Sequence, residues 1–123
     1  MKIPGASHPI SIAQATQRVR IMHGDRVIAD TQRARALQEA SYPVVYYIPR
    51  EDVDMSLLTR TDASSHCPYK GDAAYYSIDT GGRTSANAIW TYEAPYPAVA
   101  EIAGHLAFYP DRVDSITLLS LNE

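Results

Sequence analysis

The chain has 123 residues, of which 46% are hydrophobic and 20% charged, so it can form one hydrophobic core but not two ordinary domains. This composition excludes a fully disordered or fibrous protein, and the net charge of −3 argues against an extended nucleic-acid surface. We therefore expect a single domain over residues 1–123, with residues 1–7 as a flexible N-terminus.

The first half of the chain predicts a series of short strands. Apolar and polar residues alternate in several runs, and Gly24-Asp25 is the polar pair expected at a tight hairpin. The apolar run within residues 42–48 has no polar break, which is typical of a strand buried on both faces. The predicted strands are residues 8–12, 18–23, 26–30, 34–40 and 42–48.

The second half combines short helices with further strands. Residues 50–58 predict a turn of helix, because Pro49 precedes them and acidic residues occupy the first turn. Another short helix is expected within residues 95–103. The predicted strands here are residues 73–78, 86–93, 106–109 and 112–119. We expect a mainly β domain of about eight short strands in a folded-over sheet or partly open barrel, with one or two short helices.

The densest group of reactive side chains is the segment His66-Cys67-Pro68-Tyr69-Lys70-Gly71-Asp72. A nearby cation stabilises a thiolate, so Lys70 or His66 beside Cys67 would make this thiol a competent nucleophile. The competing interpretation is structural. In that case Cys67 is a small buried hydrophobe, and Lys70 is solvated at the end of a turn.

Two other groups supply candidate ligand contacts. Arg50 can bind a carboxylate or phosphate through two parallel hydrogen bonds, and Asp52 can act as a base or hold Arg50 in place. Alternatively, the acidic residues of this segment only cap a helix. Trp90 and Tyr92 share one face of a predicted strand that ends at Glu93, and they either stack on a planar ligand or belong to the core.

Metal binding is disfavoured by the sequence. A structural zinc site needs four ligands, usually in close pairs, whereas the four histidines and the single cysteine are scattered along the chain. An open catalytic site built from His66, Cys67 and His105 is the remaining metal alternative. We assign neither a metal nor a cofactor.

The arginines of the first 40 residues are the feature closest to a nucleic-acid signal. Arg18 and Arg20 share a strand face, and Arg33 with Arg35 would add positive charge beside them. We interpret this as a solvated face balanced by acids such as Asp30, and we expect no specific nucleic-acid binding, since no RNA-binding or phosphate-loop motif is present.

Cysteine usage and the absence of long apolar runs indicate the compartment. One cysteine cannot form an intramolecular disulfide, which is typical of a reducing environment. No apolar run approaches the roughly 20 residues that span a bilayer, and the N-terminus lacks the apolar segment of a secretion signal. We expect a cytoplasmic protein without membrane contact, and self-association into a homo-oligomer stays open.

Four motifs resemble a known family. They are Tyr-Ile-Pro-Arg-Glu-Asp-Val at 47–53, Cys-Pro-Tyr-Lys-Gly-Asp-Ala at 67–73, Ala-Ile-Trp-Thr-Tyr-Glu at 88–93 and Ala-Phe-Tyr-Pro at 107–110. The chain resembles domain of unknown function 427, a family of small bacterial and fungal proteins, from His8 to Val113. The resemblance implies a β-tent fold, whose relatives include zinc-binding chaperone-like proteins and methionine-sulfoxide reductases. The family also carries a nucleotidyltransferase label.

The chain departs from those relatives in the residues that carry chemistry. It lacks their paired cysteine ligands, and it has no paired-carboxylate metal site after a Gly-Ser motif. Zinc binding, reductase activity and nucleotidyl transfer therefore do not carry over, because function belongs to the site and not to the fold.

The resemblance gives a reason to join the candidate residues into one pocket. The predicted site consists of Arg50, Asp52, Cys67, Lys70, Trp90, Tyr92 and Glu93. We expect it to bind an anionic or planar small molecule, with Arg50 and Lys70 as anion contacts, Trp90 as a stacking wall and Cys67 or Asp52 as the reactive group. Whether the pocket is enzymatic stays open. The alternatives are a non-catalytic protein-interaction module and, more weakly, a nucleotide- or RNA-binding domain.

Overall fold

A computed structural model describes residues 1–121, and within this range ten strands form three antiparallel sheets. The first sheet has the order β1 (Ile10–Gln14), β4 (Arg35–Glu39), β5 (Val45–Tyr47). The second has the order β10 (Ser115–Leu119), β2 (Arg18–His23), β3 (Arg26–Thr31). The third has the order β6 (Leu58–Cys67), β7 (Gly71–Asp79), β8 (Thr84–Thr91), β9 (Leu106–Phe108).

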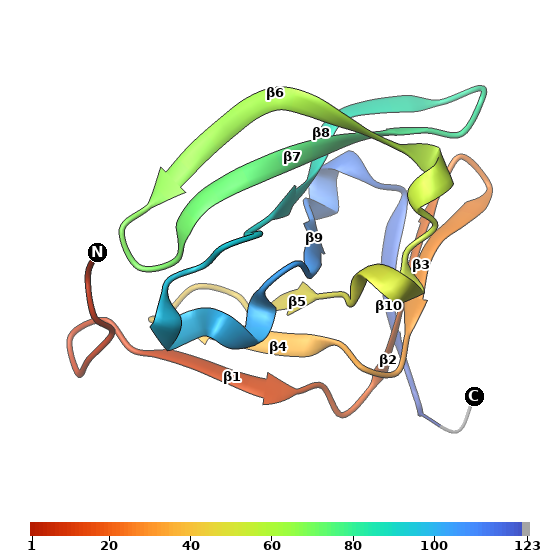
Figure 1. Cartoon of the computed structure of the whole chain (residues 1–123). Coiled ribbons are helices and arrows are strands. Elements are labelled where there is room, and N and C mark those ends of the chain that lie inside the picture. The colour runs from red at the N-terminus through yellow and green to blue at the C-terminus, as the bar shows by residue number, and fades with distance from the viewer. Residues whose placement is uncertain (122–123) are drawn as a thin grey trace.

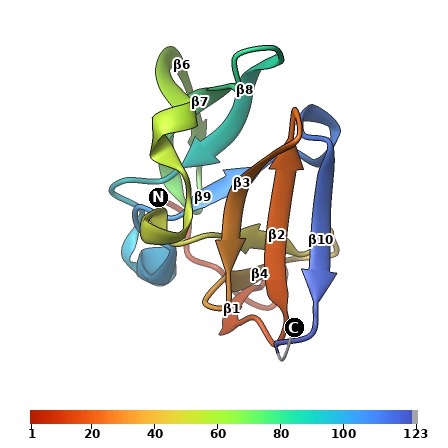
Figure 2. The ribbon, with the colours of Figure 1, turned by 90° about the vertical axis from the view of Figure 1, so that its right-hand side faces the viewer.

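The three sheets surround the core without closing into a barrel. Strands β6, β7 and β8 curve over one side of the molecule, opposite β1 and β4 (Figure 1), and β3, β2 and β10 run side by side in a separate sheet (Figure 2). A single bridge between Ile48 and Leu106 links the end of β5 to β9 of the third sheet, and a bridge between Ala29 and Val53 links β3 to the residue after the turn Arg50–Asp52. The predicted mainly β, folded-over architecture is confirmed.

The helical segments are short pieces of 3-10 helix, three of them with three residues and one with six residues and a kink at Val99. They span Arg50–Asp52, Met55–Leu57, Pro97–Ile102 and Pro110–Arg112. The third of these turns occupies the predicted crossover, where the apolar side chains of Val99 and Ile102 are fully buried. Burying two such side chains contributes about 3–6 kcal/mol, which fixes the crossover against the sheets.

The hairpin predicted at Gly24-Asp25 is confirmed, since these residues connect β2 to β3. Both have positive φ angles, 55° at Gly24 and 63° at Asp25. Two consecutive left-handed residues give the turn a twist that matches the flanking strands.

Two sequence predictions were wrong. Residues 42–48 are not one strand buried on both faces, because β5 covers only Val45–Tyr47, and before it Tyr42 is 61% exposed and Val44 is 41% exposed. Strand β6 was missed altogether. Its sequence Leu-Thr-Arg-Thr-Asp-Ala-Ser-Ser-His-Cys is mostly polar and carries no apolar alternation, because the strand curves along the outside of the molecule.

No helix within residues 1–121 has the length and apolar character needed to cross a membrane.

Candidate functional site

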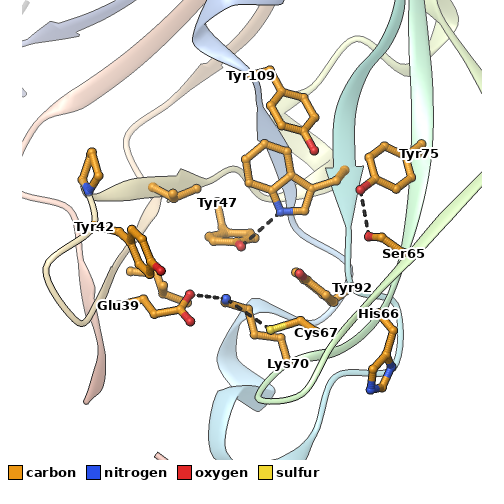
Figure 3. Close-up of a pocket in the computed structure, with 14 residues that line it drawn as sticks. Glu39, Tyr42, Tyr47, Ser65, His66, Cys67, Lys70, Tyr75, Tyr92 and Tyr109 are labelled. Carbon is orange, nitrogen blue, oxygen red and sulfur yellow. Dashed lines mark hydrogen bonds and ion pairs between the residues drawn. The ribbon is translucent and has the colours of Figure 1, made fainter. Parts of the chain in front are cut away.

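A cavity of about 360 Å³ opens between the first and third sheets. Strands β4 and β5 supply one side, and β8 and the β6–β7 hairpin supply the other (Figure 3). Its lining residues are Leu37, Glu39, Tyr42, Pro43, Val45, Tyr47, Ser65, His66, Cys67, Lys70, Tyr75, Trp90, Tyr92 and Tyr109. Four of the seven predicted site residues are among them.

The β6–β7 turn places a thiol and an ammonium side by side. Cys67 ends β6 and pairs with Gly71, so the chain reverses within three residues. Gly71 has a φ of 110°, which favours glycine at this corner. Lys70, only 7% exposed, then donates from its Nζ to Cys67 Sγ at 3.7 Å. The predicted neighbourhood of these two residues is thus present in the fold.

A carboxylate from the opposite sheet completes this cluster. Lys70 Nζ donates to Glu39 Oε1, and His8 Nε2 lies 2.7 Å from Glu39 Oε2. The His8 ring stacks on Tyr69 with centroids 4.1 Å apart, so the pair of charges also ties the β6–β7 turn to the first sheet. Burial alone would raise the pKa of Glu39, but the hydrogen bonds from Lys70 and His8 outweigh it and hold this pKa below its usual value.

The cavity walls are aromatic. Trp90 donates its indole N–H to the Tyr47 hydroxyl at 3.2 Å, and the two rings meet edge to face with centroids 6.2 Å apart. Tyr109 lies against the other side of Trp90, with ring centroids 4.5 Å apart, and Tyr75 donates to or accepts from Ser65 at 2.8 Å. Burial raises the pKa of Tyr109 to about 12. These contacts fix the rings before any ligand arrives.

Two phenol groups retain unused hydrogen-bonding capacity inside the cavity. Tyr92 is 7% exposed, and its hydroxyl points into the cavity without a hydrogen-bond partner among residues 1–121 (Figure 3). Tyr47 accepts from Trp90, but its own proton reaches no acceptor among the described residues. Burial raises the pKa of both hydroxyls, so both stay protonated and able to donate.

The other three predicted site residues lie outside this cavity. Arg50 points its guanidinium at Tyr76, with Nη1 3.4 Å from the hydroxyl, and Asp52 accepts from Thr31 at 2.6 Å and from Arg33. The turn at 50–52 sends these two side chains apart, so the expected contact between Arg50 and Asp52 is replaced by these pairings.

Glu93 also faces elsewhere. Its carboxylate forms two hydrogen bonds with Arg60 on the outer face of the third sheet, at 2.8 and 2.9 Å. The guanidinium of Arg60 is the first cause that holds the pKa of Glu93 below its usual range. The structure therefore does not gather all seven predicted residues into one pocket.

His66 precedes Cys67 and points away from it, because neighbouring residues of a strand face opposite sides. Its Nδ1 lies 2.7 Å from Asp72 Oδ1 instead. Within residues 1–121, no group of three or more histidine, cysteine, aspartate or glutamate side chains is placed to hold a metal ion.

The arginine face is paired with acids, including the predicted Asp30. Arg18 forms two hydrogen bonds of 2.6 Å with Asp30, and Arg20 donates to the same carboxylate at 3.3 Å. The hydrogen bond from Arg18 lowers the pKa of Asp30, although burial opposes it. The expectation of no specific nucleic-acid binding stays a prediction.

The sequence did not predict Glu39 and Tyr47, which line the cavity, or His8, which contacts Glu39. Glu39 contacts Lys70, and His8 contacts Tyr69, only because the first sheet folds against the β6–β7 turn. No local sequence motif indicates this packing. Tyr47 carried a usable signal, since a tyrosine in an apolar run between two prolines needs a polar partner for its hydroxyl.

The fold and the cavity define a small three-sheet β protein with an aromatic pocket closed at one end by a thiol, an ammonium and a carboxylate. The chain belongs to the family described as domain of unknown function DUF427, whose model matches residues 11–118. A comparison with curated protein sequences finds no match to this chain.

Proposed function

We propose that the cavity binds a small planar molecule that presents a carbonyl or carboxylate oxygen to its polar end. The observation that carries this proposal is the hydroxyl of Tyr92, which points into the cavity and has no hydrogen-bond partner within residues 1–121. A phenol hydroxyl carries one proton to donate, and the fold does not use the one on Tyr92. A bound acceptor oxygen in the cavity can therefore receive this hydrogen bond.

The number of donors defines the chemistry of the ligand's polar end. Tyr47 and Tyr92 each have one proton to donate. Lys70 has three, of which Glu39 and Cys67 take two. Three donors around one space favour an oxygen acceptor, and they disfavour a second cation or a purely apolar guest.

The walls define the rest of the ligand. Trp90 and Tyr109 present ring surface to the cavity, and flat aromatic rings pack on such surfaces in offset or edge-to-face arrangements. A cavity of about 360 Å³ falls at the small end of the usual range for ligand sites. The site therefore suits a molecule about the size of one substituted ring.

The chain carries its own reporter for this proposal, because Trp90 is the single tryptophan and lines the cavity. Titration with benzamide or benzoate should change the tryptophan fluorescence in a saturable way. Toluene, which has a similar ring and no acceptor oxygen, should bind at least tenfold more weakly, since it leaves the donors unpaired. Equal affinity for toluene and benzamide would contradict the acceptor part of the proposal, and no saturable change with any probe would contradict the proposal as a whole.

A further inference from the structure

We propose that Cys67 is a nucleophile for acyl transfer, and that it attacks the carbonyl carbon of an aromatic ester held in this cavity. This inference rests on the proposed binding function and adds the reaction class, the substrate class and the role of Glu39. Three features carry it: the thiol faces the cavity, an ammonium touches it, and a carboxylate on the far side of that ammonium can accept a proton.

The thiol of Cys67, the ammonium of Lys70 and the carboxylate of Glu39 lie in an order that allows proton transfer. Lys70 Nζ lies between Cys67 Sγ and Glu39 Oε1 and donates to both (Figure 3). The titratable groups that face this path are His8 on Glu39 and the phenols that line the cavity, Tyr42, Tyr47, Tyr75, Tyr92 and Tyr109. His66 is turned outward and takes no part.

Activation of the thiol needs two proton movements and no outside reagent. Lys70 passes one proton to the Glu39 carboxylate and takes the thiol proton from Cys67. The cluster then holds a thiolate, an ammonium and a carboxylic acid, and its total charge is unchanged. A thiolate next to an ammonium is the usual form of a reactive cysteine.

The thiolate then adds to the ester carbonyl carbon, and the carbonyl π pair moves onto oxygen. The negative oxygen formed in this step can accept hydrogen bonds from Tyr47, Tyr92 and the Lys70 ammonium, which are the donors that the resting site leaves unsatisfied. When the carbonyl re-forms, the carbon–oxygen bond of the ester breaks. The leaving alkoxide or phenoxide takes back the proton held by Glu39 through Lys70, which leaves a thioester on Cys67 and a free alcohol.

Water completes the cycle. A water molecule adds to the thioester carbon while its proton passes through Lys70 to Glu39. The carbon–sulfur bond then breaks, and the thiolate regains the proton. The sum of the two stages is ester plus water giving acid plus alcohol, with the cluster restored.

The chain is well suited to a direct test, because Cys67 is its only cysteine. Incubation with p-nitrophenyl acetate should release p-nitrophenolate in a burst and add one acetyl group to the protein. Peptide mapping should locate that group on Cys67, and neutral hydroxylamine should remove it, as expected of a thioester. Acylation at pH 7 should be at least tenfold faster than that of N-acetylcysteine, Cys67→Ser should abolish the burst, and benzamide should slow it by occupying the cavity.

The role of Glu39 has its own readout in the pH profile. In the wild type the acylation rate should change little between about pH 5 and about pH 8, because an ionised carboxylate is available throughout this range. Glu39→Gln keeps an acceptor for Lys70 but cannot take a proton, so its rate should climb steadily with pH as an ordinary thiol does. Tyr46→Phe, which lies outside this cavity, should keep the wild-type profile.

The outcomes separate this inference from the binding proposal. If benzamide binds saturably and Cys67 is acylated no faster than N-acetylcysteine, the nucleophile is overturned and the binding site stands. If Cys67 is acylated rapidly and benzamide neither binds nor protects, the binding proposal fails in its ligand class. A Glu39→Gln profile that matches the wild type would overturn the proton path, provided that circular dichroism shows the variant folded.

Discussion

The molecule has two clusters in which acidic and basic side chains pair, and the two clusters differ in their surroundings. On the arginine face, Asp30 accepts from both Arg18 and Arg20, and the carboxylate is satisfied within the surface of one sheet. In the cavity, Glu39 and Lys70 come from different sheets, and their side chains are 17% and 8% exposed. There the ammonium also contacts a thiol and faces two phenols with protons to donate.

The difference lies in what each pair leaves unsatisfied. The Arg18 and Asp30 side chains are 21% and 29% exposed, so solvent screens this pair more than the cavity pair; screened pairs contribute roughly 0–1 kcal/mol. A buried pair must overcome the cost of removing two charges from water, which often exceeds their mutual attraction. We propose that such a pair, at a cavity with unused donors, belongs to a functional site, and we assign the arginine face a structural role.

Removal of the Lys70 charge should produce the largest effect. Lys70→Met would leave the Glu39 carboxylate buried with only the His8 imidazole as a hydrogen-bond partner, so the free energy of unfolding should fall by about 3–5 kcal/mol. Replacing both residues, Lys70→Met with Glu39→Leu, should recover most of the loss, because no unpaired charge remains. Urea denaturation measures both variants, and a single variant as stable as the wild type would show that the buried pair is not tightly coupled.

The second-largest effect should be a loss of stability at low pH, when Glu39 is protonated and its pairing with Lys70 is lost. The pKa of Glu39 is lower in the folded chain than in the unfolded chain, so its contribution is complete above the unfolded value and is lost as pH falls through the folded one. We expect the wild type to lose about 2 kcal/mol more than Glu39→Gln does between pH 7 and about pH 3, on the scale of hydrogen bonds to a charged group. Parallel slopes for the two proteins in a denaturation series across this range would count against the prediction.

The arginine face should give the smallest effect. Arg18→Gln removes the two-pronged contact with Asp30 but leaves Arg20 on the same carboxylate, so the free energy of unfolding should fall by about 1 kcal/mol or less. The loss should shrink in 1 M salt, where the pair is screened. A loss as large as that of Lys70→Met would remove the contrast between the two clusters.

The sequence predicts much of this fold because its strands are short and clearly patterned. Strands β2 and β3 and their Gly24-Asp25 turn, and the crossover with buried Val99 and Ile102, follow from local alternation and turn chemistry. Strand β6 does not, because its polar side chains face outward along a curved sheet and carry no burial signal. The exposure of Tyr42 and Val44 was also missed, since an apolar run does not reveal which neighbours are absent.

In the site, too, contacts between residues close in sequence were easier to predict than contacts between distant residues. Cys67 and Lys70 are three residues apart across one turn, and Tyr92 follows directly after β8, which holds Trp90, so their proximity was predictable. Glu39 lies 31 residues from Lys70, and their meeting depends on how two sheets fold together. Arg50 and Asp52 show the reverse error, because closeness in sequence did not bring their side chains together at a 3-10 turn.

The most direct test of the account is the affinity of Tyr92→Phe for benzamide, followed by Trp90 fluorescence, beside Tyr46→Phe as the matched control. The Tyr92 hydroxyl has no partner within residues 1–121, so its removal should leave the free energy of unfolding unchanged or higher. The loss of a donor to the ligand should weaken binding by about five- to tenfold, while Tyr46→Phe binds as the wild type does. Unchanged affinity in Tyr92→Phe together with a loss of stability would contradict the account, since it would make this hydroxyl a part of the fold and not of a binding site.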